Sequence, residues 1–156
     1  MLSKPEYGWT DFQLEGTSRY VLSYTDDIAF DWLDKAIEGL ETLKPFCVKG
    51  FMEPNRFLCL VSYWNCHIIT EDDSSRVLED GEIEMEYSHT SMLDFCRYLY
   101  EDISRNIDPW TCFCSQAPNS RYAYQSKRAL LKKKLNTLNR LIAQREARFG
   151  PSGSFL

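Results

Sequence analysis

The chain has few of the residues on which most enzyme signatures depend. Its 156 residues include seven glycines and two histidines, His67 and His89. It contains no glycine-rich phosphate-binding motif and no Gly-x-Ser-x-Gly turn. Two histidines supply too few ligands for most metallohydrolases. These absences argue against the common nucleotide-binding, hydrolytic and metal-dependent enzymes, and the sequence predicts no catalytic residue, no metal site and no cofactor.

Long apolar runs are absent as well. No stretch approaches the roughly 18 apolar residues that a membrane-spanning helix requires. Residues 1–6 lack the apolar core of a secretory signal. We therefore expect a chain that works in the cytoplasm and has no membrane partner.

The remaining composition is typical of a globular protein. Hydrophobic residues make up 44% and charged residues 26% of the chain, which predicts one folded domain. Without an export signal, the six cysteines are expected to be reduced thiols. Cys112 and Cys114 are separated by one residue, whereas structural zinc sites usually place two to four between paired cysteines. An alternative is a small enzyme or ligand-binding protein with a pocket around Cys66 and His67, or around Cys112 and Cys114.

Charge is distributed unevenly along the chain. The net charge is −5, yet residues 1–110 carry nine basic and 22 acidic side chains, and residues 111–156 carry nine basic side chains and one acidic. The acidic excess is greatest in residues 71–86, which hold eight carboxylates and one base. Such a surface repels nucleic acid and speeds encounter with cationic proteins. A solvated edge without a partner is the simpler alternative.

These carboxylates, with two tryptophans near predicted turns or strand ends, form the predicted partner-binding surface. Tryptophan at such positions is a frequent anchor of protein interfaces, although it can also cover the edge of a core. The predicted contact residues are Glu71, Asp72, Asp73, Glu79, Asp80, Glu82, Glu84, Glu86, Trp64 and Trp110.

Alternation of polar and apolar residues predicts an antiparallel meander. The longest apolar stretch reads as one central strand, or as two strands with a bend near Asn65. In the last strand, Met85 and Tyr87 are expected on one face, and the glutamates are expected to form an outward row that discourages aggregation. Strands are predicted at residues 11–15, 19–24, 46–51, 57–69 and 76–88.

Apolar spacings of three and four predict three helices, at residues 27–43, 91–106 and 121–148. Pro45 ends the first helix. Ser91 followed by Asp94 resembles a capping box at the start of the second. Pro109 and Trp110 follow the second helix, and residues 111–120 are expected to form an irregular connection.

The third helix is basic and carries a leucine-rich stripe with heptad spacing. We expect it to pack on the sheet or on the acidic body. Dimerisation through this helix and contact with phosphate are alternatives, and the acidity of the rest opposes nucleic acid. The predicted organisation is a single α+β domain: an antiparallel sheet packed by two helices over residues 1–120, a basic helix over 121–149, and a flexible tail over 150–156.

The order of strand, helix, acidic meander and second helix resembles the small bacterial immunity proteins of polymorphic-toxin and contact-dependent inhibition systems. The resemblance covers residues 19–110, and the second helix reads Ser-Met-Leu-Asp-Phe-Cys-Arg-Tyr-Leu-Tyr-Glu-Asp-Ile from Ser91. It implies a stoichiometric inhibitor, without catalytic residues, that binds a cognate basic toxin domain. The basic helix lies outside the resemblance. The leading hypothesis is therefore a cytoplasmic protein-binding module, monomeric or homodimeric, of this immunity type.

Overall fold

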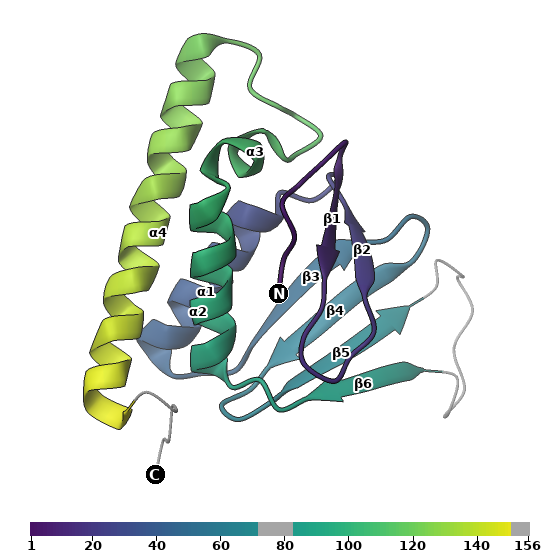
Figure 1. Ribbon diagram of the computed structural model, residues 1–156, viewed down its shortest axis with the longest axis vertical. Helices are drawn as coiled ribbons and strands as arrows, with labels where there is room; N and C mark the ends of the chain where they lie inside the picture. The colour runs from purple at the N-terminus through teal and green to yellow at the C-terminus, as the bar shows by residue number, and fades with distance from the viewer. Residues whose placement is uncertain (72–82, 151–156) are drawn as a thin grey trace.

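Two antiparallel sheets and four helices make up the fold in the computed structural model, which describes residues 1–71 and 83–150 (Figure 1). The predicted α+β class is confirmed. The elements run β1 (Trp9–Phe12), β2 (Tyr20–Ser23), α1 (Ile28–Thr42), β3 (Phe46–Phe51), β4 (Arg56–Val61), β5 (Cys66–Glu71), β6 (Glu84–Ser88), α2 (Met92–Arg105), α3 (Ile107–Cys112) and α4 (Arg121–Phe149).

The sheets have the predicted meander topology. β1 and β2 form a hairpin, and the second sheet has the order β3-β4-β5-β6, with each strand antiparallel to the next. The apolar run 57–69 divides into β4 and β5, because Ser62 and Asn65 close a turn between them, with the Ser62 N–H donating to the Asn65 carbonyl at 2.9 Å. Of the strand predicted at 76–88, the structure describes residues 83–88, and β6 forms over Glu84–Ser88.

One face of the four-stranded sheet carries the core. α1, α2 and the β1–β2 hairpin pack on this face, and the hairpin crosses the sheet in Figure 1. The Phe57 ring lies 4.9 Å from Phe12 of the hairpin and 6.2 Å from Trp32 of α1. Trp32 in turn lies 6.1 Å from Phe95 of α2. This aromatic cluster joins hairpin, sheet and helices, because each of them contributes at least one large ring.

α4 forms a third layer against α1, α2 and α3, on the side of the helices away from the sheet (Figure 1). Its positive charges meet acidic residues of these helices and the adjoining loop, so the basic and acidic parts of the sequence meet within one chain. α4 therefore packs on the helices of its own chain. The ion pairs are Lys127 with Asp27, Arg128 with Asp108, and Lys134 with Asp34. The buried residues of α4 are Leu131, Leu135, Leu138, Leu141 and Ile142.

The predicted break after α2 is a short helix, α3, and it corrects one predicted contact residue. Pro109 lies in the first turn of α3, where a backbone N–H has no helical partner to lose. The chain therefore stays helical and turns Trp110 inward, where it is 0% exposed and packs 5.1 Å from Phe113. A buried side chain cannot contact a partner, so the prediction of Trp110 as a surface anchor is wrong.

Candidate functional site

The face of the sheet opposite the core is covered by none of the described helices and strands. Its side chains form two rows across β4, β5 and β6, because residues paired in register point to the same side. In one row Leu60 pairs with His67, which pairs with Tyr87; in the other Leu58 pairs with Ile69, which pairs with Met85. We call this surface the open face, defined by Leu58, Leu60, His67, Ile69, Met85 and Tyr87.

The open face exposes large apolar side chains next to one another. Met85 is 63% exposed, Tyr87 44% and Leu60 42%. Single exposed apolar residues are ordinary, but a contiguous group of them on a soluble protein marks an interaction surface. The predicted contact residue Trp64, in the turn between β4 and β5, is also exposed, at 46%.

Two histidines hold the Tyr87 ring in position. The ring centroid of Tyr87 lies 5.3 Å from that of His67 and 4.8 Å from that of His89, both edge to face. The Tyr87 hydroxyl and the Nδ1 atom of His89 share a hydrogen bond of 3.2 Å. A tyrosine held in this way loses little side-chain entropy when a partner binds, which favours a role as an interface anchor.

Polar residues lie at the margin of the open face. Lys49 of β3 pairs in register with Leu58, and Arg56 of β4 pairs with Glu71 of β5. An apolar centre with a polar margin is the usual anatomy of a protein–protein interface. The open face has this anatomy, which is suited to binding another protein.

Comparison with known proteins finds no match. No family model matches this chain, and neither the curated proteins nor the solved structures contain a match. None of the helices in the described ranges is long and apolar enough to cross a bilayer. Function is therefore inferred from the surfaces of the chain.

The predicted acidic surface is only partly within the described residues. Glu71 points to the open face, whereas Glu84 and Glu86 point to the opposite face, because they pair in register with Thr70 and the buried Ile68. Glu84 and Glu86 thus share one face of β6, as the alternation predicts, but this face is the one that carries the core and not the predicted outward one. The remaining predicted members lie outside the described residues: Asp72, Asp73, Glu79, Asp80 and Glu82.

Glu86 binds the β1–β2 hairpin, which corrects its predicted outward orientation. Its carboxylate accepts hydrogen bonds from the Ser18 N–H at 2.7 Å, the Ser18 hydroxyl at 2.6 Å and the Tyr20 hydroxyl at 2.7 Å. The bonds from Ser18, with that from Tyr20, lower the pKa of Glu86. Burial, with the bond to Glu86, raises the pKa of Tyr20. Glu86 thus joins β6 to the hairpin.

We expect the substitution Glu86→Gln to lower the free energy of unfolding by about 1 kcal/mol at pH 7, because charge-assisted hydrogen bonds to a partly exposed group are lost. The pKa of Glu86 is lower in the folded protein than in the unfolded chain, where it is about 4.3. Ionised Glu86 therefore stabilises the fold at every pH above about 4.3. The difference between wild type and variant should therefore vanish as the pH falls through the lowered pKa. Urea denaturation from pH 7 to pH 3 measures it. Glu84→Gln, two residues away on the same strand, is the control and should change stability by less than about 0.5 kcal/mol.

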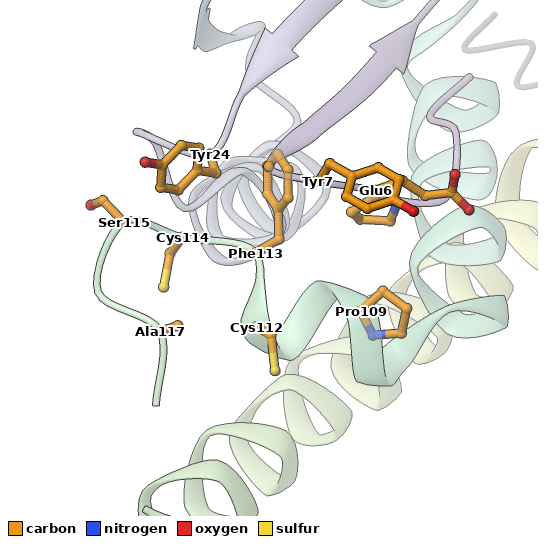
Figure 2. A pocket seen from close by; sticks show the side chains of 11 residues that line it. Glu6, Tyr7, Tyr24, Pro109, Cys112, Phe113, Cys114, Ser115 and Ala117 are labelled. Atoms are coloured by element: carbon orange, nitrogen blue, oxygen red, sulfur yellow. The ribbon is translucent and has the colours of Figure 1, made fainter. Parts of the chain in front are cut away.

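Of the two alternative pockets predicted, the one around Cys66 and His67 does not form, whereas Cys112 and Cys114 do line a cavity. The Cys66 thiol points into the core and donates to the Thr90 carbonyl at 3.4 Å, whereas His67 belongs to the open face. Cys112 and Cys114 line a separate cavity of about 580 Å³ beside the start of the chain (Figure 2). Within the described ranges, no three His, Cys, Asp or Glu side chains are grouped to hold a metal ion.

The open face itself was missed in the sequence. The available signal was the run 57–69, whose apolar residues occupy both faces of β4 and β5. Such a run predicts a central strand, because apolar residues on both faces are typical of a strand covered on both sides. The alternative, a strand with one face in the core and the other available to a partner, gives the same pattern.

Proposed function

We propose that this chain is a protein-binding module that binds a cationic protein through the open face. The observation that carries the proposal is the group of exposed apolar residues on an uncovered sheet face, with Tyr87 held in position on its edge strand. Burial of such side chains supplies the main free energy of association, and tyrosine is among the residues most often found as hot spots.

The distribution of charge favours a cationic partner. Residues 71–86, which begin at the last residue of β5 and end within β6, carry eight acidic side chains and one basic. The basic α4 lies on the other side of the molecule, beyond α1 and α2 (Figure 1). Several of its charges are neutralised by Asp27, Asp34 and Asp108. A basic partner would therefore be attracted to the sheet side, mainly through a faster encounter.

The most specific form of the proposal is an immunity-type inhibitor in the cytoplasm, as the sequence resemblance implies. The partner would then be a cognate toxin domain, bound one to one. Dimerisation through α4 is the alternative. It is less favoured, because the heptad-spaced Leu131, Leu135 and Leu138 are already buried within the chain. The inhibitor form is tested by adding the purified chain to the isolated partner and measuring the partner's activity at equimolar ratio.

Site-specific cross-linking tests whether the open face binds a protein. Tyr87 and Tyr122 are both exposed tyrosines, one on the open face and one on α4, so each can be replaced by a photo-reactive phenylalanine analogue of similar shape. In extract of the native cell, we expect the analogue at position 87 to capture one basic protein and the analogue at position 122 not to capture it. Equal capture at both positions, or capture of a second copy of this chain at position 87, would contradict the proposal.

With the captured partner purified, Tyr87→Ala should weaken binding about thirtyfold, the effect of losing a hot spot of about 2 kcal/mol. Isothermal titration calorimetry measures the dissociation constant. Tyr122→Ala is the matched control and should leave it unchanged. Raising the salt concentration should weaken binding of the wild type, because screening reduces the attraction of opposite charges. A constant unaffected by Tyr87→Ala would place the interface elsewhere.

A further inference from the structure

Cys112 and Cys114 are held together by a tight turn at the end of α3. The Cys114 N–H donates to the Cys112 carbonyl at 3.0 Å, and Phe113 between them has φ −81° and ψ 81°, the geometry of an inverse γ-turn. Phe113 is buried against Trp110, which anchors the turn. In the view of Figure 2 both thiol side chains point to the same side of the turn.

A cavity of about 580 Å³ opens beside this turn. Tyr7 and Tyr24 line it together with Phe113 and the two cysteines (Figure 2). Cys112 is exposed and Cys114 is partly exposed, so a small molecule in the cavity can reach both sulfur atoms. The aromatic side chains offer apolar surface to such a molecule.

Lys127 of α4 holds a positive charge beside the sulfur atom of Cys114. Its Nζ atom donates to the Cys114 Sγ atom at 3.0 Å and to the Asp27 carboxylate at 2.7 Å, and it lies 5.0 Å from the centre of the Phe30 ring. Burial alone would lower the pKa of Lys127, but the hydrogen bonds to Asp27 and Cys114 raise it. The lysine therefore stays charged, and a neighbouring cation stabilises negative charge on sulfur.

The other cysteines lack this combination. Cys59, Cys66 and Cys96 are buried, and burial raises the pKa of Cys96. Cys47 is exposed as a residue, but its thiol group is partly buried, and this burial raises the pKa of the thiol. Among the described residues, Lys127 is the one cation hydrogen-bonded to a cysteine sulfur. Exposure, a nearby second thiol and a fixed cation therefore coincide at Cys114.

We propose that Cys114 and Cys112 form a dithiol site that reduces a small organic disulfide bound in this cavity. In the first step the Cys114 thiolate attacks one sulfur of the disulfide, so that a mixed disulfide forms and the other half leaves as a thiolate. In the second, the Cys112 thiolate attacks the Cys114 sulfur and releases the second half. The protein loses two electrons and two protons and gains a Cys112–Cys114 disulfide, and the ligand becomes two thiols.

The aromatic disulfide 5,5′-dithiobis(2-nitrobenzoate) is a suitable probe, because each released thiolate is coloured. In a Cys47→Ser background, which removes the exposed cysteine elsewhere, we expect two coloured equivalents per chain in a rapid phase and a protein disulfide between positions 112 and 114. Adding Cys112→Ser should give one equivalent and a stable adduct, which mass spectrometry should locate on Cys114. An adduct that remains on Cys114 when Cys112 is present would overturn the proposal, as would first reaction at Cys112.

The role of the lysine is tested by the rate of the first step. Lys127→Met should slow it at least about fivefold, because the cation that stabilises the attacking sulfur is lost. Lys127→Arg, which keeps the charge, should retain most of the rate. Lys134→Met is the matched control. Lys134 lies on the same helix as Lys127 and also pairs with an aspartate, Asp34 of α1, but it donates to no cysteine. Circular dichroism confirms that each variant is folded. Equal rates for Lys127→Met and Lys134→Met would refute the assignment.

Discussion

A chain that ends at Ser120 is expected not to fold. Such a truncation removes the five buried side chains of α4 and uncovers the faces of α1, α2 and α3 on which they pack. Each buried leucine or isoleucine contributes about 1.5–3 kcal/mol, so the loss is comparable to the whole stability of an ordinary domain. The truncation also removes Arg145, which donates to the Leu40 carbonyl at 2.9 Å near the end of α1.

Thermal unfolding followed by circular dichroism measures this effect. We expect no cooperative transition for residues 1–120 and a transition like that of the full chain for residues 1–150. The predicted division into a core of residues 1–120 and a helix of residues 121–149 stays a prediction until this is measured. A cooperative transition in the shorter chain would show that the core folds without α4.

The three long helices were predicted well because each of their signals is local. Ser91 caps α2 as expected, its hydroxyl accepting from the Asp94 N–H at 3.1 Å. Ser120 does the same for α4, accepting from the Ala123 N–H at 3.1 Å. The predicted range 121–148 differs from α4 by one residue. Capping and apolar spacing depend on neighbours within one or two turns, and the sequence displays these directly.

The orientation of β6 could not be predicted in the same way. Alternation separates Met85 and Tyr87 from Glu84 and Glu86, but it does not tell which set faces the covered side of the sheet. Ser18 of the hairpin decides this, because it offers Glu86 two donors. That contact joins residues far apart in the sequence. The open face was missed for the same reason.

Trp110 shows a second limit of sequence patterns. Pro109 and the polar residues around it indicated the end of a helix, and a tryptophan beside such a break was placed at the surface. The chain instead forms another turn of helix, and that turn rotates Trp110 into the core. Proline at the start of a helix and proline after its end look alike unless the next packing partner is known.

The substitution Trp32→Ala is expected to cost about 3–5 kcal/mol of unfolding free energy, the range for removing a large buried ring. Trp32 is 1% exposed, and its ring lies 5.5 Å from that of Phe12 and 6.2 Å from that of Phe57. Its Nε1 atom also donates to the Lys49 carbonyl of β3 at 2.8 Å. The loss therefore combines a cavity at the centre of the aromatic cluster with an unpaired carbonyl.

Trp32→Phe separates these two contributions, because it keeps an aromatic ring and removes the N–H donor. We expect it to cost about 2 kcal/mol, less than Trp32→Ala, while Tyr122→Ala on the exposed side of α4 should change stability by less than about 0.5 kcal/mol. Urea denaturation of the three variants measures the order.

Since the Lys49 carbonyl belongs to the strand beside the open face, the same variants connect core packing to binding. If Trp32→Phe weakened partner binding as much as Tyr87→Ala while the protein stayed folded, the geometry of the open face would depend on the bond between α1 and β3. Equal losses of stability for Trp32→Ala and Tyr122→Ala would contradict the central position of Trp32 in the core.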